Sequence, residues 1–125
     1  MSMPCTATTR KNRHVAIVDL AGRFTVGTAT GVIRQAVAEL LKAGERKIIL
    51  NLAEVSYMDS AAGVGELVAS YTSTCSLGGR LKLLRPGQRV EHVLHIVRLD
   101  QVFETYTDEE EAVRSFTQQA CPACG

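Results

Sequence analysis

The sequence carries almost no net charge and has no long apolar run. Lysine and arginine together number 14 against 13 acidic residues, so the formal net charge is +1. A balance so close to neutral does not favour nucleic acid or an anionic membrane as a partner. No apolar run approaches the roughly 20 residues that span a bilayer. What remains is a chain of 125 residues, 46% of them hydrophobic, which suits one domain with its own core.

The N-terminus lacks the features of a secretory signal. Residues 1–12 are polar and have no apolar middle. We therefore expect a cytoplasmic protein whose four cysteines are mostly reduced. We expect residues 1–5 to be disordered, residues 6–117 to form the domain, and residues 118–125 to form a flexible C-terminal tail.

Convergent polar groups of the kind that catalysis needs are scarce. His92 and His95 lie three residues apart on a predicted helix, where they could share a metal ion. No carboxylate or thiol pattern completes such a site, so a solvated helix face is the favoured interpretation. The glycines near Ser60 do not form a phosphate-binding loop of the G-x-x-x-x-G-K-[ST] type. We therefore expect no enzymatic activity, no resident metal and no cofactor.

The cysteines leave two alternatives open. Cys121 and Cys124 form a C-x-x-C, which supplies half of a zinc site or a redox pair. Redox pairs of this kind usually open a helix after a strand, whereas this pair lies in the predicted tail. An inert tail is the favoured interpretation, with zinc binding or redox sensing as alternatives. Cys75 falls on the apolar stripe of a predicted helix and is expected in the core.

Hydrophobic periodicity predicts strands that alternate with helices after an initial hairpin. Residues 47–52 are the most apolar strand, expected at the sheet centre with both faces covered. The alternation predicts an α/β domain with a mixed, mostly parallel sheet of four to five strands and about four helices. The predicted strands are 5–10, 14–20, 47–52, 80–84 and 102–106, and the predicted helices are 28–43, 60–76, one beginning near Pro86 and one beginning at Thr107.

Turn and cap residues predict the connections, and helical spacing predicts the buried faces. The connections are Lys11–Asn12 as the hairpin turn, 21–27 as a loop, Thr28 and Gly44 as the two ends of the first helix, and Thr107 with Glu110 as a capping box. The expected buried faces are Ile33, Ala36, Val37, Leu40 and Leu41 in the first helix, Val90, Val93, Leu94 and Val97 in the third, and Ala112, Val113 and Phe116 in the last.

The most informative stretch joins the central strand to the second helix. Asp59 and Ser60 stand where the helix is expected to begin, and side-chain oxygens there accept the unpaired N–H groups of the first turn. That end of a helix carries partial positive charge, so a phosphate on Ser60 would be stabilised. Gly63 and Gly65 follow in the first turns. They indicate either close packing of the helix on the sheet or a smooth surface that a partner can approach.

Taken in order, several segments resemble the STAS domain of bacterial anti-sigma factor antagonists. The resemblance covers roughly residues 6–117 and implies a STAS-like sandwich. The Asp-Ser motif alone is weakly specific, but the ordered set is fairly specific. The segments are 51–60 with Gly63 and Gly65, 21–25, 78–84, and 90–99 with 102–104.

The resemblance also implies a regulatory role. In such antagonists an anti-sigma factor that is also a serine kinase phosphorylates the serine after the aspartate, here Ser60. The unphosphorylated form binds the anti-sigma factor and frees the sigma factor, and phosphorylation breaks the complex. The alternative is a non-phosphorylated assembly module of a transport or sensor complex. The partner-binding residues that the resemblance implies are Arg23, Thr25, Asp59, Ser60, Ala61, Gly63 and Gly65.

Two positions depart from the family pattern. The family usually reads Asp-Ser-Ser/Thr/Ala-Gly-Leu/Ile-Gly, whereas residues 59–65 here read Asp-Ser-Ala-Ala-Gly-Val-Gly, one alanine longer. Many antagonists also carry an acidic residue where this chain has Thr25. Both differences bear on kinase recognition, and an unmodified helix cap is the alternative role for Ser60.

Overall fold

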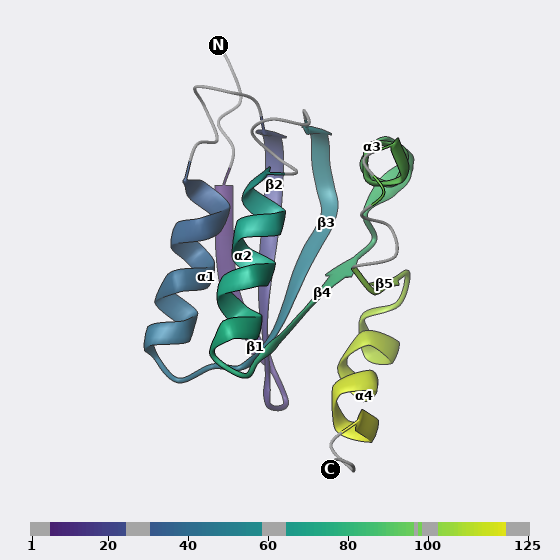
Figure 1. Cartoon of the computed structure of the whole chain (residues 1–125). Coiled ribbons are helices and arrows are strands. Elements are labelled where there is room, and N and C mark those ends of the chain that lie inside the picture. Colours follow the sequence, from purple (N-terminus) through teal and green to yellow (C-terminus); the bar gives the residue numbers. More distant parts are fainter. Residues whose placement is uncertain (1–5, 25–30, 59–64, 97, 99–102, 120–125) are drawn as a thin grey trace.

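The computed structural model describes residues 6–24, 31–58, 65–96, 98 and 103–119. Within them five strands form one mixed sheet in the order β1-β2-β3-β4-β5, with β1 antiparallel to β2 and the other pairs parallel. Four helices accompany the sheet (Figure 1), which confirms the predicted α/β class. The strands are Thr6–Asn12, Val15–Phe24, Lys47–Met58, Arg80–Leu84 and Thr105–Tyr106, and the helices α1 to α4 are Val32–Lys42, Gly65–Ser76, Gly87–Ile96 and Glu109–Gln119.

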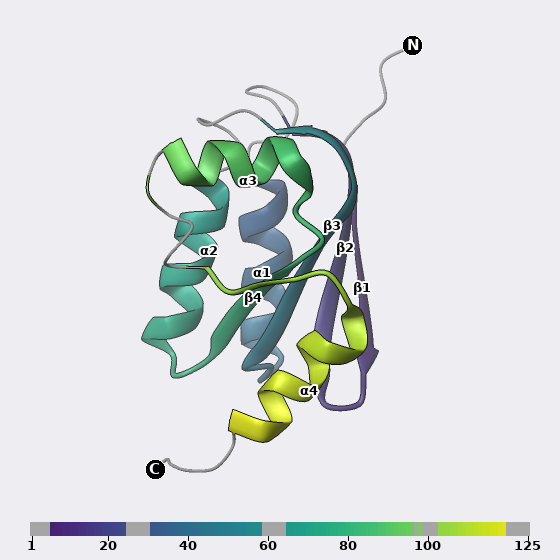
Figure 2. The same ribbon diagram turned by 90° about the vertical axis from the view of Figure 1, so that its right-hand side faces the viewer.

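The sheet separates two hydrophobic clusters, because successive side chains of a strand point to opposite faces. On β3, Ile48 and Leu50 pack with α1 and α2, whereas Ile49 packs with α4. All three are fully buried, which confirms the prediction that this strand is covered on both faces. Figure 2 shows α4 in front of the sheet and α1 and α2 behind it, with α3 near the end of β3.

The central strands are longer than the sequence patterns predicted. β2 continues to Phe24 through part of the predicted 21–27 loop, and β3 continues to Met58 instead of ending at residue 52. The two strands stay paired past a register shift after Asp19. At the same level the side chain of Asn51 accepts the N–H of Ala53 and donates to Asp19. The alternation of apolar and polar residues is lost at this irregularity. The sequence pattern therefore predicted strands that end too early.

Some turns and helix caps in the structure differ from those that the sequence predicted. The hairpin turns at Arg13 and His14, not at Lys11–Asn12, and Arg13 has a φ of 61°. α1 begins after Gly31, later than predicted, and Thr28 lies outside the described residues. The helix ends as predicted at Gly44, whose φ of 95° suits glycine. The buried residues Ile33, Val37 and Leu41 confirm the predicted face of α1.

In the C-terminal part, the last strand is shorter and the last helix is longer than the sequence predicted. β5 covers only Thr105–Tyr106. Asp108, not Thr107, caps α4, because its Oδ2 accepts the N–H of Glu111 at 3.1 Å. α4 runs to Gln119, past the predicted domain end, and Ala112, Val113 and Phe116 are buried as expected.

A salt-bridge network holds the start of α4 against the hairpin. Arg10 contacts Asp19 at 2.6 Å and Glu109 at 2.7 Å, and Asn12 donates to Glu109 at 2.8 Å. The hydrogen bond from Arg10 lowers the pKa of Glu109 from 4.5 to about 2. Because the folded-state pKa is depressed, this contribution to stability is complete above about pH 4.5 and is lost as the pH falls toward 2.

Glu109→Gln should therefore make the free energy of unfolding depend less on pH in the acidic range. We expect a loss of about 1 kcal/mol or less at pH 7, because the pair is partly exposed. Between pH 5 and pH 3 the variant should lose less further stability than the wild type. Urea unfolding at a series of pH values measures this. Glu111→Gln, an exposed change on the same helix, is the control, and parallel pH profiles for all three proteins would contradict the prediction.

Candidate functional site

One end of the molecule gathers the ends of β2 and β3 and the starts of α1 and α2 (Figure 1). In parallel α/β sheets the residues beyond the carboxyl ends of the strands commonly form the functional surface. The residues predicted to bind a partner belong to this end by their sequence positions. Of these, Arg23 and Gly65 are described, whereas Thr25, Asp59, Ser60, Ala61 and Gly63 lie outside the described residues.

Arg23 is an exposed cation held at the strand ends. It pairs in register with Tyr57 across β2 and β3. Its guanidinium carbon lies 5.5 Å from the centre of the Tyr57 ring, a cation–π contact. The ring therefore contacts the guanidinium while the Arg23 side chain remains exposed to solvent.

Gly65 does not pack closely on the sheet. It is exposed, and a Cβ built on it would have no atom within 4 Å. Close packing, one of the two explanations considered for this glycine, is therefore wrong at Gly65, and the open-surface explanation stays a prediction. Gly79 is the opposite case, because a Cβ there would lie 2.6 Å from the carbonyl oxygen of Arg46.

Alanine at these two glycines should give opposite results. Gly65→Ala should keep or raise stability, by up to about 1 kcal/mol, because alanine favours the helix and has space. Gly79→Ala should cost about 1–3 kcal/mol, because a backbone carbonyl must shift. Thermal unfolding of both variants tests this, with partner binding as a second readout for Gly65→Ala. A destabilised Gly65→Ala protein would show that helix packing requires this glycine.

The structure shows a link between α1 and α2 that the sequence analysis missed. Glu66, in the first turn of α2, is only 8% exposed. Its carboxylate lies 3.1 Å from Arg34 Nε and accepts the backbone N–H of Arg34 at 3.2 Å. An acidic residue in the first turn was the available signal. Its partner on α1 could not be inferred without the tertiary structure.

Cys75 is exposed, so the prediction that it belongs to the core is wrong. The buried row of α2 is instead Glu66, Ser70 and Thr74, with Leu67 beside it. Thr74 can be buried because its hydroxyl donates to the carbonyl of Ser70 at 2.8 Å. Cys75 lines a surface cavity of about 390 Å³ at the far end of α2. Cys121 and Cys124 lie outside the described residues.

The described residues offer no metal site. His92 and His95 are exposed, in agreement with a solvated helix face. Among the residues described, no group of three His, Cys, Asp or Glu side chains could hold a metal ion. None of the described helices is long and apolar enough to cross a membrane.

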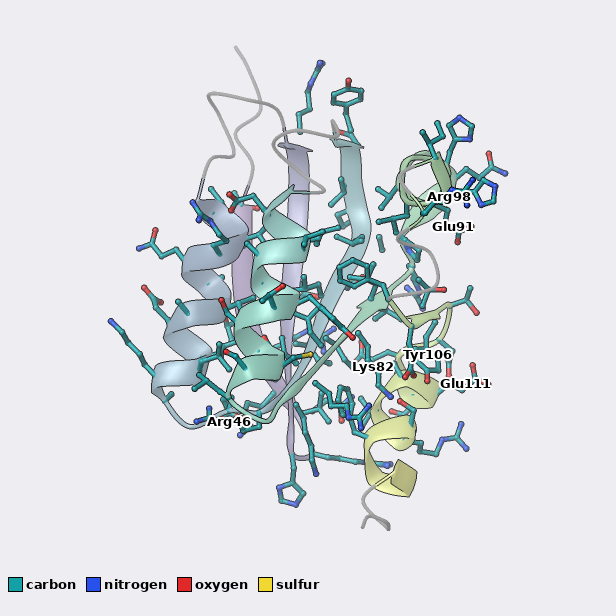
Figure 3. The ribbon with its side chains drawn as sticks, viewed as in Figure 1. Arg46, Lys82, Glu91, Arg98, Tyr106 and Glu111 are labelled. Carbon is teal, nitrogen blue, oxygen red and sulfur yellow. The ribbon has the colours of Figure 1, made fainter. Side chains whose placement is uncertain are left out.

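A buried lysine on the face of the sheet that α4 covers has a structural role. Lys82 is 1% exposed, and its Nζ donates to Ser115 at 2.8 Å and lies 3.1 Å from Glu104. Partial burial raises the pKa of Glu104, but hydrogen bonds from Tyr106 and Lys82 outweigh burial and lower it. Figure 3 shows Lys82 and Tyr106 on the side of the sheet that α4 covers. These side chains join β4 to α4 and lie away from the carboxyl ends of β2 and β3.

The mixed sheet of five strands and the four helices of the described residues match the STAS class of α/β domains. The chain belongs to the STAS domain family, whose model matches residues 6–112.

Relatives and solved structures agree with this assignment. A Thermotoga neapolitana protein, whose name assigns it provisionally as an anti-sigma factor antagonist, is 39% identical over 75 residues, or 60% of this chain and 66% of that protein. The match thus spans slightly less than two thirds of that relative. The solved structure of TM1081 from Thermotoga maritima has a TM-score of 0.77 at 26% identity and covers 89% of this chain and 88% of that one. Phosphorylated SpoIIAA of Bacillus has a TM-score of 0.69 at 23% identity, with 89% and 99% covered.

Proposed function

We propose that this chain is an anti-sigma factor antagonist that binds an anti-sigma factor with serine kinase activity and is released when Ser60 is phosphorylated. The observation that carries the proposal is the position of the Asp-Ser motif between the end of β3 and the start of α2 in a STAS domain. The names of the relatives point the same way. SpoIIAA, which shares the fold, has been solved in phosphorylated and unphosphorylated forms. The expected place of action is the cytoplasm.

Chain connectivity supports a surface shared by the motif and the strand ends. Ser60 follows Met58, the last residue of β3, by two residues. Two residues span at most about 7 Å, so the motif must stay close to the strand end that carries Tyr57 and Arg23. A phosphate there would add a charge of about −2 near the strand end that carries the exposed Arg23. Such a change is large enough to alter binding to a charged partner.

The direct test is phosphorylation by the cognate kinase. Wild type, Ser60→Ala and Ser60→Asp would be incubated with kinase and ATP and analysed by mass spectrometry, and their affinities measured by isothermal titration. We expect phosphate on wild type alone, persistent binding by Ser60→Ala, and weak binding by Ser60→Asp. Ser60→Ala should lose about 0.5–2 kcal/mol of stability if the hydroxyl caps the helix. Ser56→Ala, an exposed serine on β3, is the matched control.

Two outcomes would overturn the switch. If Ser60 gains no phosphate and the three proteins bind equally, the alternative role as a constitutive assembly module of a transport or sensor complex takes its place. If phosphate appears on another residue, Ser60 is not the switch.

A further inference from the structure

β2 and β3 continue together beyond the part of the sheet that β4 joins. β3 pairs with β4 over residues 47–51, whereas its pairing with β2 continues to the last residue of β3. Figure 1 shows the two strands extending past the end of β4. Residues 20–24 and 52–58 therefore form a two-stranded ribbon. The buried Leu52 and the half-buried Val55 attach this ribbon to the main hydrophobic cluster, so its backbone is anchored.

A register change near the end of the ribbon brings Arg23 and Tyr57 side by side. Gly22 pairs with Val55, and the next residue of β2, Arg23, pairs with Tyr57. Ser56 is therefore an extra residue in β3, an irregularity of the β-bulge type. Gly22 has a φ of 100° at this step, a conformation that glycine adopts readily. Bulges redirect side chains and are frequent next to functional sites.

The Arg23 guanidinium combines exposure with a restraining contact. Its carbon lies 5.5 Å from the centre of the Tyr57 ring, and the contact reduces the freedom that the side chain would lose on binding. None of the ion pairs among the described residues includes Arg23. Glu54, the other charged residue of the ribbon, lies opposite Ala21 instead. The N–H groups of a guanidinium form a planar fork that fits a carboxylate.

We propose that Arg23 binds an acidic side chain of the anti-sigma factor and that Tyr57 is the residue that positions it. The carboxylate of the partner accepts two N–H groups of the guanidinium. Arginine and tyrosine are also among the residue types that most often dominate the free energy of binding at interfaces. This inference rests on the proposed function, which supplies the partner. It adds the chemistry of one contact and a residue, Tyr57, that the family resemblance did not include.

Charge substitutions at Arg23 test the acidic partner group. The affinities of wild type, Arg23→Ala, Arg23→Lys and Arg23→Glu for the cognate anti-sigma factor would be measured by isothermal titration at two salt concentrations. We expect Arg23→Ala to bind about tenfold more weakly than wild type, Arg23→Lys to be intermediate, and Arg23→Glu to be the weakest. Added salt should weaken wild type more than Arg23→Ala, because the variant lacks the ion pair. Arg114→Glu, the same charge change at an exposed position of α4, is the control and should bind like wild type.

A double-mutant cycle tests the role of Tyr57. Tyr57→Leu removes the ring and should weaken binding about threefold, whereas Tyr57→Phe keeps the ring and should bind like wild type. In an Arg23→Ala background Tyr57→Leu should have no further effect, because the ring then has no guanidinium to hold. An equal loss in both backgrounds would overturn the positioning role. Thermal unfolding checks that every variant is folded.

The outcomes separate this inference from the proposed function. If wild type binds the anti-sigma factor and Arg23→Ala binds it equally well, the acidic contact is wrong while the proposed function stands. Tighter binding by Arg23→Glu would show that the facing group of the partner is cationic, which also overturns the contact. If wild type does not bind the anti-sigma factor, the proposed function is wrong and this inference falls with it.

Discussion

Leu50→Asp is expected to abolish cooperative folding. Leu50 lies on β3 at the sheet centre, is fully buried, and packs in the cluster that β3 forms with α1 and α2. Whether it stays charged or takes up a proton, an unpaired carboxyl group in such a site costs a large fraction of the net stability of about 5–15 kcal/mol typical of a domain. Thermal unfolding followed by circular dichroism should show no sigmoidal transition, and the protein should bind a hydrophobic dye.

A matched control is available on the same strand. Ser56 is exposed on β3, so Ser56→Asp introduces the same carboxylate without burying it. We expect Ser56→Asp to unfold cooperatively near the wild-type temperature. A cooperative transition in Leu50→Asp at that temperature would mean that β3 is not the centre of the core.

Leu94→Ala is expected to lower the free energy of unfolding by about 2–5 kcal/mol, the usual cost of a cavity left by a buried leucine. Leu94 is 1% exposed on α3 and belongs to the cluster that contains Val90 and Phe103. Urea unfolding measures the loss. The loss should have little effect on partner affinity as long as the protein remains folded.

Ile96 provides the comparison on the same helix, because it is 62% exposed. Ile96→Ala should change stability by about 0.5 kcal/mol or less. If Leu94→Ala leaves stability unchanged and abolishes partner binding, this face of α3 is an interface instead of core. The expected burial of Val90 and Leu94 is confirmed by the structure, whereas the side chains of Val93 and Val97 lie outside the described residues.

The sequence pattern predicted the structure correctly where one physical effect dominates. The apolar run around Leu50 requires a strand covered on both faces, and the structure has it there. Gly44 ends α1 because a positive φ at that position strongly favours glycine. Where several interactions compete, the sequence pattern alone did not predict the structure. Pairing between β2 and β3 extended both strands past a register shift, and a hydrogen bond within α2 allowed Thr74 to be buried while Cys75 faces solvent.

For the candidate site, the sequence by itself determined the order of elements around the Asp-Ser motif and hence the end of the sheet to which the motif belongs. Only the tertiary structure decided which side chains meet there. The Arg23–Tyr57 stacking and the Arg34–Glu66 pair join residues more than 30 positions apart. Such contacts depend on how strands pair and helices pack, and periodicity within a single element holds no information about them.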